Sequence, residues 1–499
     1  MGESRWLAFW SESESPFMTH RVLLVNPNRM KPPVTPIALD YLADALRRRG
    51  IRADVLDLCF HQDWRAAVDA HFAHNAADAV GVTLRNIDDT TFASQEFFLP
   101  GFKEVTDYLI NRAGVPVVVG GSGFSIMPED VLAYCRLDLG IVGDGEDSLP
   151  SLVQKLAAGE DYTSVPGLVY RDAAGFRRNA PGWRSLDGGE VPGRSAVDNR
   201  RYFAEGGMGS IESKRGCPGA CIYCVDAQSK GRRSRCRSPK SVVAEMEALL
   251  GQGIGCLHFC DAEFNLPASH AKDVCREMIR KGLGEKLGWY AYASPVPFDG
   301  DTAALYRKAG CRGINFGVDS ADDEVLRMLG RDFDVQEMRH TAAACHEQGL
   351  VFMYDLLLGG PGETKESLSR TIHALKQMSP DRVGAALGIR VFPGTRLAEL
   401  VLQSGPLESN SNLHGAVADN ERLFSPLFYL SAELGDDVPQ YLEKLIDSDQ
   451  RFLFMKPPQA GDMNYNYNDN SCLVEAIRQG YRGAFWDILR RVSEGADAE

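Results

Sequence analysis

The chain has 499 residues, of which 44% are hydrophobic, and its formal net charge is −14. This length predicts two or three domains, because a globular domain averages ~150 residues. The negative charge argues against a general nucleic-acid or anionic-membrane binder. No uninterrupted apolar run of ~20 residues is present, so no transmembrane helix is expected. The polar, acidic beginning does not resemble a secretory signal, and twelve scattered cysteines predict reduced thiols and a cytoplasmic location.

Strand and helix patterns alternate between residues 20 and 170, after an N-terminal extension of residues 1–19. A helix is predicted to begin at Pro36, with Thr35 as its cap, and to end at Gly50. Such alternation favours a doubly wound, Rossmann-like parallel sheet, whose ligands bind beyond the carboxyl ends of the strands. The apolar runs that predict strands cover residues 21–26, 55–58, 79–83, 115–119 and 139–142.

Polar residues and glycines occupy the ends of these predicted strands, at residues 26–28, 83–86, 120–123 and 143–146. Glycines at such positions allow a large ligand to approach the backbone, although they are equally compatible with simple turns. Residues 171–209 are rich in Gly, Pro, Arg and Asp without periodicity, and we interpret them as a linker.

A second alternation covers residues 210–400. Its six strand–helix units favour a partial TIM-type barrel, in which function is located at the carboxyl ends of the strands. Residues 401–499 differ in character: an Asn- and Tyr-rich stretch at 463–470 precedes a terminal helix, so this region either covers the substrate or caps the barrel. The predicted strands of the barrel cover residues 211–213, 256–259, 289–292, 313–318, 351–356 and 385–391.

Three cysteines lie within eight residues after the first strand of this second domain, at Cys217, Cys221 and Cys224. A structural zinc site needs four ligands, and a disulfide framework needs an even count in a small secreted chain. Three thiolates on one tight loop instead suit a [4Fe-4S] cluster that keeps its fourth iron open. Zinc remains the alternative interpretation.

The C-x3-C-x2-C spacing, with Tyr223 before the last cysteine, resembles the signature of radical S-adenosylmethionine (SAM) enzymes. The resemblance extends in order along residues 214–395, through the Gly-Gly-Pro-Gly-Glu turn at 359–363 and the Phe-Pro-Gly sequence at 392–394. Each of these features also has a purely structural interpretation. Asp261 and Glu263 could cap the next helix, residues 359–363 could form a simple turn, and Arg331 could form a surface ion pair. The SAM contacts that the resemblance implies are Tyr223, Asp261, Glu263, Ser294, Asp319, Ser320, Arg331, Leu358 and Gly360.

The order of segments in residues 20–170 resembles the cobalamin-binding domain of B12-dependent radical SAM enzymes. The Asp-x-His-x-x-Gly motif that places a histidine on cobalt is absent; the nearest string, around His71, is predicted to be part of an ordinary amphipathic helix. The lower face of cobalamin is then expected to meet Leu84, Arg85 or Asn86, unless the domain binds no cobalamin. The full set of implied contacts is Asn26, Leu84, Arg85, Asn86, Gly121, Ser122, Gly123, Gly143, Gly145 and Glu146.

The resemblance implies an enzyme that reductively cleaves SAM to a 5′-deoxyadenosyl radical and transfers methyl from methylcobalamin to an unactivated carbon of a small molecule or natural product. It also implies an external electron donor such as flavodoxin or ferredoxin. Two alternatives stay open: a radical SAM rearrangement or cyclisation without methylation, and a non-catalytic Fe–S or zinc-binding protein. The sequence identifies no catalytic acid or base, no substrate and no oligomeric state.

Overall fold

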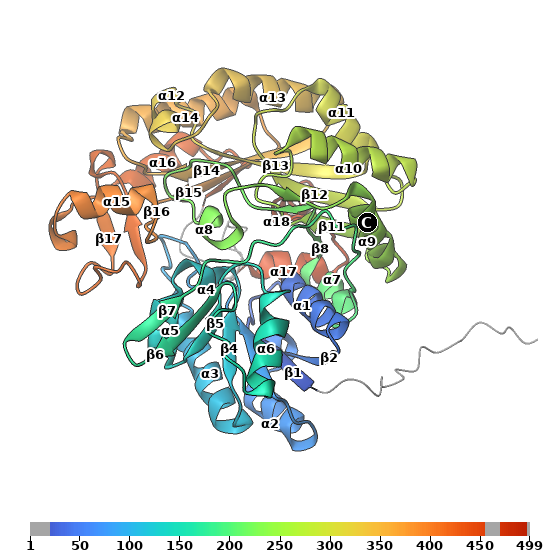
Figure 1. The fold of residues 1–499 in the computed structure, drawn as a ribbon. Helices are drawn as coiled ribbons and strands as arrows, with labels where there is room; N and C mark the ends of the chain where they lie inside the picture. The colour runs from blue at the N-terminus through green and yellow to red at the C-terminus, as the bar shows by residue number, and fades with distance from the viewer. Residues whose placement is uncertain (1–19, 455–469, 497–499) are drawn as a thin grey trace, which may run out of the picture.

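The computed structural model describes residues 20–454 and 470–496 and divides into two α/β units (Figure 1). The N-terminal unit, at the bottom of the view, lies against a larger barrel-like unit at the top, with the short helix α8 (Asp226–Lys230) between them. Each unit is built on a seven-stranded sheet. The expected fold class, a Rossmann-like domain followed by a partial barrel, is confirmed.

The N-terminal sheet has the order β2-β1-β3-β4-β5-β6-β7. Its first five strands are parallel, whereas β6 and β7 form an antiparallel hairpin at one edge. The strand order reverses direction beside β1, so the carboxyl ends of β1 and β3 flank the crevice where such sheets bind ligands. The strands are β1 His20–Asn26, β2 Ile51–Asp57, β3 Ala79–Thr83, β4 Val117–Gly120, β5 Leu139–Ile141, β6 Leu168–Asp172 and β7 Gly175–Arg178.

Both faces of this sheet are covered by helices. Alternate residues of β1 enter separate cores: Val22 and Leu24 pack on one face, and Leu23 and Val25 on the other. This burial explains why the strand reads as a continuous apolar run. Helices α1 and α6 cover the first face, and α2, α3 and α5 the second. The helices of this unit are α1 Ile37–Arg48, α2 Trp64–His74, α3 Leu99–Ala113, α4 Ser122–Ile126, α5 Pro128–Cys135 and α6 Ser148–Ala158.

The predicted start of α1 is wrong by one residue. The helix begins at Ile37, Pro36 takes the N-cap position, and no side chain caps it. Thr35, expected as the cap, has a hydroxyl without a hydrogen-bond partner among the described residues. His71 lies in the amphipathic helix α2, as expected, where its ring meets that of Phe72.

The segment expected as a linker contains regular structure. Residues 171–209 include the end of β6, all of β7 and the helix α7 (Asn199–Gly206). The hairpin extends one edge of the N-terminal sheet, and Tyr202 of α7 is buried near the other edge, where its hydroxyl donates to Asp57 of β2. A strand at the edge of a sheet is stabilised by pairing with its neighbour. The strand propensity of about five residues is too weak a signal to predict such a strand from sequence.

The second sheet has the order β19-β15-β14-β13-β12-β11-β8, and all its pairings are parallel. Four of its strands lie at the predicted positions, whereas β8 shares only Ile211 with the predicted run and β15 begins and ends earlier than predicted; β19 adds a seventh strand that the sequence did not indicate. The strands are β8 Gly209–Ile211, β11 Cys256–Phe259, β12 Gly288–Ala293, β13 Cys311–Asp319, β14 Val351–Leu358, β15 Arg382–Leu387 and β19 Phe452–Phe454.

Helices cover the outside of this curved sheet, while α17 and α18 close one end of its interior through Trp486 and its neighbours. Thr364 caps α14 in a capping box with Ser367. The helices are α9 Pro239–Gly251, α10 Ala268–Arg280, α11 Gly300–Lys308, α12 Asp323–Met328, α13 Val335–Gln348, α14 Lys365–Met378, α15 Arg396–Gln403, α16 Val438–Ile446, α17 Ser471–Arg478 and α18 Phe485–Ser493.

Two small sheets complete the fold. Strands β9 (Lys214–Arg215) and β10 (Arg235–Cys236) pair beside the cysteine loop, and β16 (Ile389–Arg390), β17 (Leu413–Gly415) and β18 (Leu427–Tyr429) form a three-stranded sheet after the barrel. Most of the Asn- and Tyr-rich stretch lies outside the described residues. In the part of the chain that the structure covers, no helix has both the length and the apolar character needed to cross a membrane.

Candidate functional site

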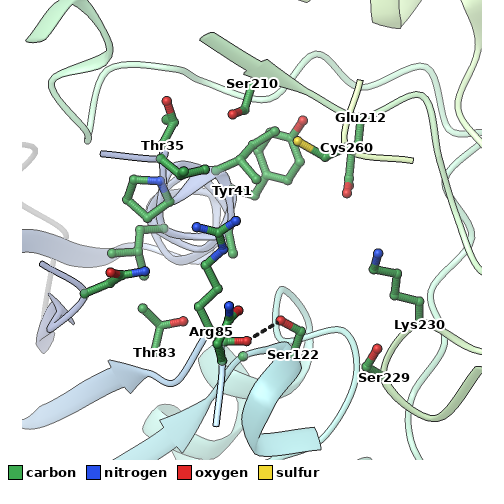
Figure 2. A pocket seen from close by; sticks show the side chains of 18 of the residues that line it. Thr35, Tyr41, Thr83, Arg85, Ser122, Ser210, Glu212, Ser229, Lys230 and Cys260 are labelled. Atoms are coloured by element: carbon green, nitrogen blue, oxygen red, sulfur yellow. Dashed lines mark hydrogen bonds between the residues drawn. The ribbon is translucent and has the colours of Figure 1, made fainter. Parts of the chain in front are cut away.

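A cavity of about 880 Å³ lies where the two units meet. The N-terminal sheet contributes the carboxyl ends of β1, β3, β4 and β5, and the barrel contributes residues of β8, β11, β12 and β13. Figure 2 shows Arg85 and Ser122 on the N-terminal side, with Ser210, Glu212 and Cys260 on the barrel side. A ligand in this space would contact both units at once.

The loops after β3 and β4 are packed tightly together below the cavity. The Ser122 hydroxyl donates to the Arg85 carbonyl at 2.9 Å, as the dashed line in Figure 2 marks. Gly121 has a φ of 105°, and a Cβ there would lie 2.5 Å from the Leu84 carbonyl oxygen. Only glycine fits this position, and the main chain is therefore available to a large ligand.

Most residues expected to contact cobalamin do line the cavity. Leu84 does not: its side chain is buried in the core of the sheet. Gly123 is also absent from the lining and packs against the Arg85 carbonyl. Arg85 extends into the open space (Figure 2), and its guanidinium makes no hydrogen bond or ion pair with any described residue. The residues confirmed in the lining are Asn26, Arg85, Asn86, Gly121, Ser122, Gly143, Gly145 and Glu146.

Two of these lining residues already have strong protein partners. The Asn26 amide donates to Asp57 and to the Tyr202 hydroxyl, each at 2.9 Å. Glu146 accepts from Arg215 at 2.5 Å; burial acts to raise the pKa of its carboxyl, but the charge of Arg215 together with hydrogen bonds lowers it. Their side chains therefore shape the wall, and their polar atoms are largely satisfied within the protein.

The three motif cysteines share one loop at the mouth of the barrel. A Cβ on Gly219 would lie 3.3 Å from Cys217 Sγ and 3.9 Å from Cys221 Sγ, so both sulfurs face the inside of the loop. Burial raises the pKa of both thiols. Bound iron would favour their thiolate form, because a metal's positive charge offsets the cost of burying the anion. The loop thus fits a cluster ligated by cysteine.

Arg331 lies directly against this loop. One guanidinium N–H donates to Cys221 Sγ at 3.0 Å, and another donates to the Gly317 carbonyl. Arg331 also approaches Asp319 at 3.5 Å and Glu263 at 3.9 Å, which brings together three of the residues expected at the SAM site. The surface-ion-pair alternative for Arg331 is wrong, since its side chain is only 7% exposed.

Polar atoms without hydrogen-bond partners lie beside the cysteine loop, around Arg331. Among the described residues, Glu263 Oε2 and Arg331 Nε are buried without a hydrogen-bond partner. Burial raises the pKa of Glu263 to about 7, although the charges of Arg331 and Lys214 act to lower it. Tyr223 donates its hydroxyl to Asp319 at 2.6 Å and so connects the cysteine loop with the end of β13. SAM, with its amine, carboxylate and hydroxyls, matches these unpaired atoms.

Three other residues expected to bind SAM are engaged elsewhere. Both oxygens of Asp261 accept from Ser213, at 2.8 and 2.5 Å. The Ser320 hydroxyl pairs with Thr371 at 3.0 Å and is fully buried behind the strand end. Ser294 is buried, and its hydroxyl accepts from a backbone N–H two residues later. Direct SAM contact by the Asp261 and Ser320 side chains is therefore not supported; both shape the backbone instead.

The glycine-rich turn after β14 has an internal acid that organises it. Glu363, fully buried, accepts from the N–H groups of Gly359 and Gly360. Leu358 belongs to the barrel core, and a Cβ on Gly360 would lie 2.9 Å from Leu329. Leu358 and Gly360 thus offer backbone, and no polar side chain, to a neighbouring ligand.

Sequence patterns did not indicate the barrel wall of the cavity, which is aromatic. Tyr290, Tyr292, His258 and Trp486 line it, and the His258 and Tyr292 rings meet edge to face at 5.1 Å. Burial, with a smaller contribution from the Arg85 charge, lowers the pKa of His258 to about 4, so its imidazole is neutral near pH 7. This wall offers planar, uncharged surfaces to a ligand.

Sequence patterns also missed the ion pairs that join the two units. Arg194 pairs with Asp40 of α1 at 2.9 Å and with Glu245 of α9 at 2.8 Å, and all three side chains are almost completely buried. Arg390 pairs with Asp88 at 2.8 Å in the same way. Their sequence separation of 51 to 302 residues explains why no local pattern revealed them.

Comparison with known proteins matches both units. Residues 28–153 match the B12 binding domain, and residues 211–375 match the Radical SAM superfamily. The chain is 32% identical to a Tryptophan 2-C-methyltransferase of Streptomyces laurentii, over 93% of this chain and 95% of that protein. It is equally similar, at 32% identity and a TM-score of 0.88, to the radical SAM methyltransferase TsrM of Kitasatospora setae, solved with tryptophan substrate and a SAM analog. That match covers 95% of this chain and 98% of the other.

A second solved form of the same Kitasatospora setae protein contains cobalamin and a [4Fe-4S] cluster. The chain is 31% identical to it, with a TM-score of 0.86, over 96% of this chain and 98% of the other. The cobalamin-dependent SAM radical enzyme OxsB shares the fold at 15% identity, with a TM-score of 0.67 over 86% of this chain.

Proposed function

The chain belongs to the cobalamin-dependent radical SAM methyltransferases, and from this premise we propose that it methylates carbon 2 of tryptophan or of a closely related indole. Membership confirms the predicted enzyme class and its cofactor set of [4Fe-4S] cluster, SAM and cobalamin. It also decides against the rearrangement and non-catalytic alternatives. The substrate assignment rests on the relatives named for tryptophan, which this chain matches along nearly its whole length.

The observation that carries the proposal is the character of the cavity. One wall consists of the strand ends of the B12 binding domain, and the opposite wall presents Tyr290, Tyr292, Trp486 and neutral His258. Aromatic rings bind a planar aromatic ligand through edge and face contacts. Because these side chains are uncharged, the ligand does not have to displace water from a charged group when it binds to them. An indole between these walls would lie against the methyl carrier.

We assign roles to individual residues on this basis. Bound SAM and cobalamin supply the methyl group and its carrier, which is chemistry that no side chain provides. Cys217, Cys221 and Cys224 hold the cluster, and Arg331 donates to one of the sulfurs. Tyr223, Glu263 and Asp319 orient SAM, as their position around Arg331 supports.

Arg85 is our candidate for the lower face of cobalamin. It extends from the end of β3 into the cavity, it is exposed to that space, and the described residues offer it no side-chain partner. Leu84 is excluded from this role by its burial in the sheet core. Asn86, which also lines the cavity, is the remaining alternative.

We further propose that electrons reach the cluster from an external donor such as flavodoxin or ferredoxin, in the cytoplasm. Pro218, Gly219 and Ala220 of the cysteine loop are exposed. A donor protein could therefore approach the cluster without displacing another part of the described chain.

The test is anaerobic incubation of the reconstituted holoenzyme with L-tryptophan and SAM labelled in its methyl group. The expected product is tryptophan with one labelled methyl at carbon 2, identified by mass and NMR. As a control, 2-methyltryptophan should accept no label. Release of deoxyadenosine with no labelled product from tryptophan or other indoles would refute the proposal.

A further inference from the structure

Lys214 presents an unbalanced positive charge to the cavity. It lies on β9, three residues before the first cysteine of the cluster loop, and only 2% of its surface is exposed. It lines the cavity, and its ammonium forms no hydrogen bond or ion pair with any described residue. A cation that is held almost completely enclosed and reaches a cavity without an ion-pair partner points to an anion supplied by a ligand.

The neighbouring cations differ in this respect, because each has a carboxylate of its own. Arg215 pairs with Asp144, Glu146 and Glu212, Lys230 pairs with Asp226 at 3.2 Å, and Arg237 pairs with Glu245 at 2.6 Å. The acids around Lys214 are engaged by other groups: Glu212 pairs with Arg215, Asp261 accepts from backbone and from Ser213, and Glu263 lies nearest to Arg331. Lys214 therefore lines the cavity beside the cluster loop without an ion-pair partner among the described residues, although its charge is felt by Glu263.

We propose that Lys214 binds the carboxylate of the methyl-accepting substrate, which makes that substrate an aromatic amino acid or a similar aromatic carboxylate. The inference rests on the proposed function and deepens it. Arg331 already lies at the SAM side of the loop, against Cys221 and Asp319. Lys214 instead shares the cavity with the aromatic wall, so one ligand can place its ring on Tyr292 and its carboxylate on the ammonium.

The experiment compares L-tryptophan with tryptamine, which lacks only the carboxylate. Binding to anaerobic holoenzyme is measured by calorimetry, and methylation is measured by labelled SAM. The wild-type enzyme should bind tryptophan about 10- to 100-fold more tightly than tryptamine, the usual range for a buried hydrogen bond to a charged group. Lys214→Met should bind both ligands equally and weakly, and Lys214→Arg should recover most of the preference.

Controls distinguish loss of carboxylate binding from other effects of the Lys214→Met substitution. Lys365→Met, at an exposed pair with Asp437, should keep the full preference for tryptophan. SAM affinity should remain within about twofold of wild type in Lys214→Met, since Arg331, and not Lys214, forms the ion pairs with Glu263 and Asp319. A Lys214→Met enzyme that still prefers tryptophan overturns the inference, as does a variant altered only in SAM affinity or only in cluster potential.

The same data distinguish failure of this inference from failure of the proposed function. Tight binding of tryptophan without methylation refutes the proposed function alone. Methylation with an unchanged preference in Lys214→Met refutes the inference alone. No binding of tryptophan to the wild-type holoenzyme refutes both.

Discussion

Replacing Arg194 by Met should destabilise the protein strongly, because it leaves buried carboxylates without their shared cation. Arg194 donates to Asp40 at 2.9 Å, to Glu245 at 2.8 Å, and to Ser210 and Asn199 at 2.9 Å each. Removing one partner from a buried ion pair costs about 3–5 kcal/mol. Arg237 still neutralises Glu245, so the loss should come mainly from Asp40.

Urea unfolding of the wild type and variant, followed by tryptophan fluorescence, measures this loss as a change in the free energy of unfolding. Arg48→Met is the control: its pairs with Asp44 and Glu190 are exposed, so a change of at most about 1 kcal/mol is expected. Adding Asp40→Asn to Arg194→Met should recover part of the stability, because a neutral amide tolerates burial better. An Arg194→Met protein as stable as the Arg48→Met control would refute the reasoning.

Two other substitutions test the loop and the glycine-rich turn. Cys221→Ala should fold, with an unchanged far-ultraviolet spectrum, but should lose cluster absorbance and all methylation; Cys345→Ala, at a buried cysteine of α13, should keep both. Burial raises the pKa of Glu363 to about 7 from 4.5, despite the N–H groups of Gly359 and Gly360, which act to lower it. The folded state therefore holds this proton more tightly, and its contribution to stability is complete below pH 4.5 and is lost as the pH rises through 7. Relative to Glu363→Gln, wild-type stability should fall by ~3 kcal/mol between pH 4.5 and 8 in urea unfolding, and an identical pH dependence of the two proteins would contradict this.

The sequence predicted the elements whose evidence is local. Strand β11 occupies the predicted residues 256–259 because a short apolar run in a parallel sheet is buried on both faces. The cysteine loop and the glycine-rich turn were equally visible, since their geometry depends on neighbouring residues. In contrast, β19 has only three residues and owes its existence to pairing with β15, which lies about 70 residues earlier.

Side-chain direction at the strand ends could not be predicted in the same way. Asp261 and Glu263 are two residues apart and were equally good candidates for SAM. One accepts from Ser213, 48 residues earlier, whereas the other faces Arg331. Likewise, Thr371, 51 residues later, holds the Ser320 hydroxyl. In each case the direction of the side chain is set by a partner that is distant in sequence. A motif therefore identifies the strand end, but not which of its side chains reaches the ligand.

Opposite charges on the facing surfaces explain how the B12 binding domain is held over the barrel. The N-terminal domain supplies carboxylates and the linker and barrel supply guanidinium groups, so the contact is complementary although the chain as a whole carries a net charge of −14. Several of these pairs are buried, and buried pairs are costly to separate. The cavity between the units is therefore preformed, and a substrate enters a site whose two walls are already fixed. The pairs are Asp40 with Arg194, Asp88 with Arg390, Asp130 with Arg422, Asp144 with Arg215 and Arg235, and Glu146 with Arg215.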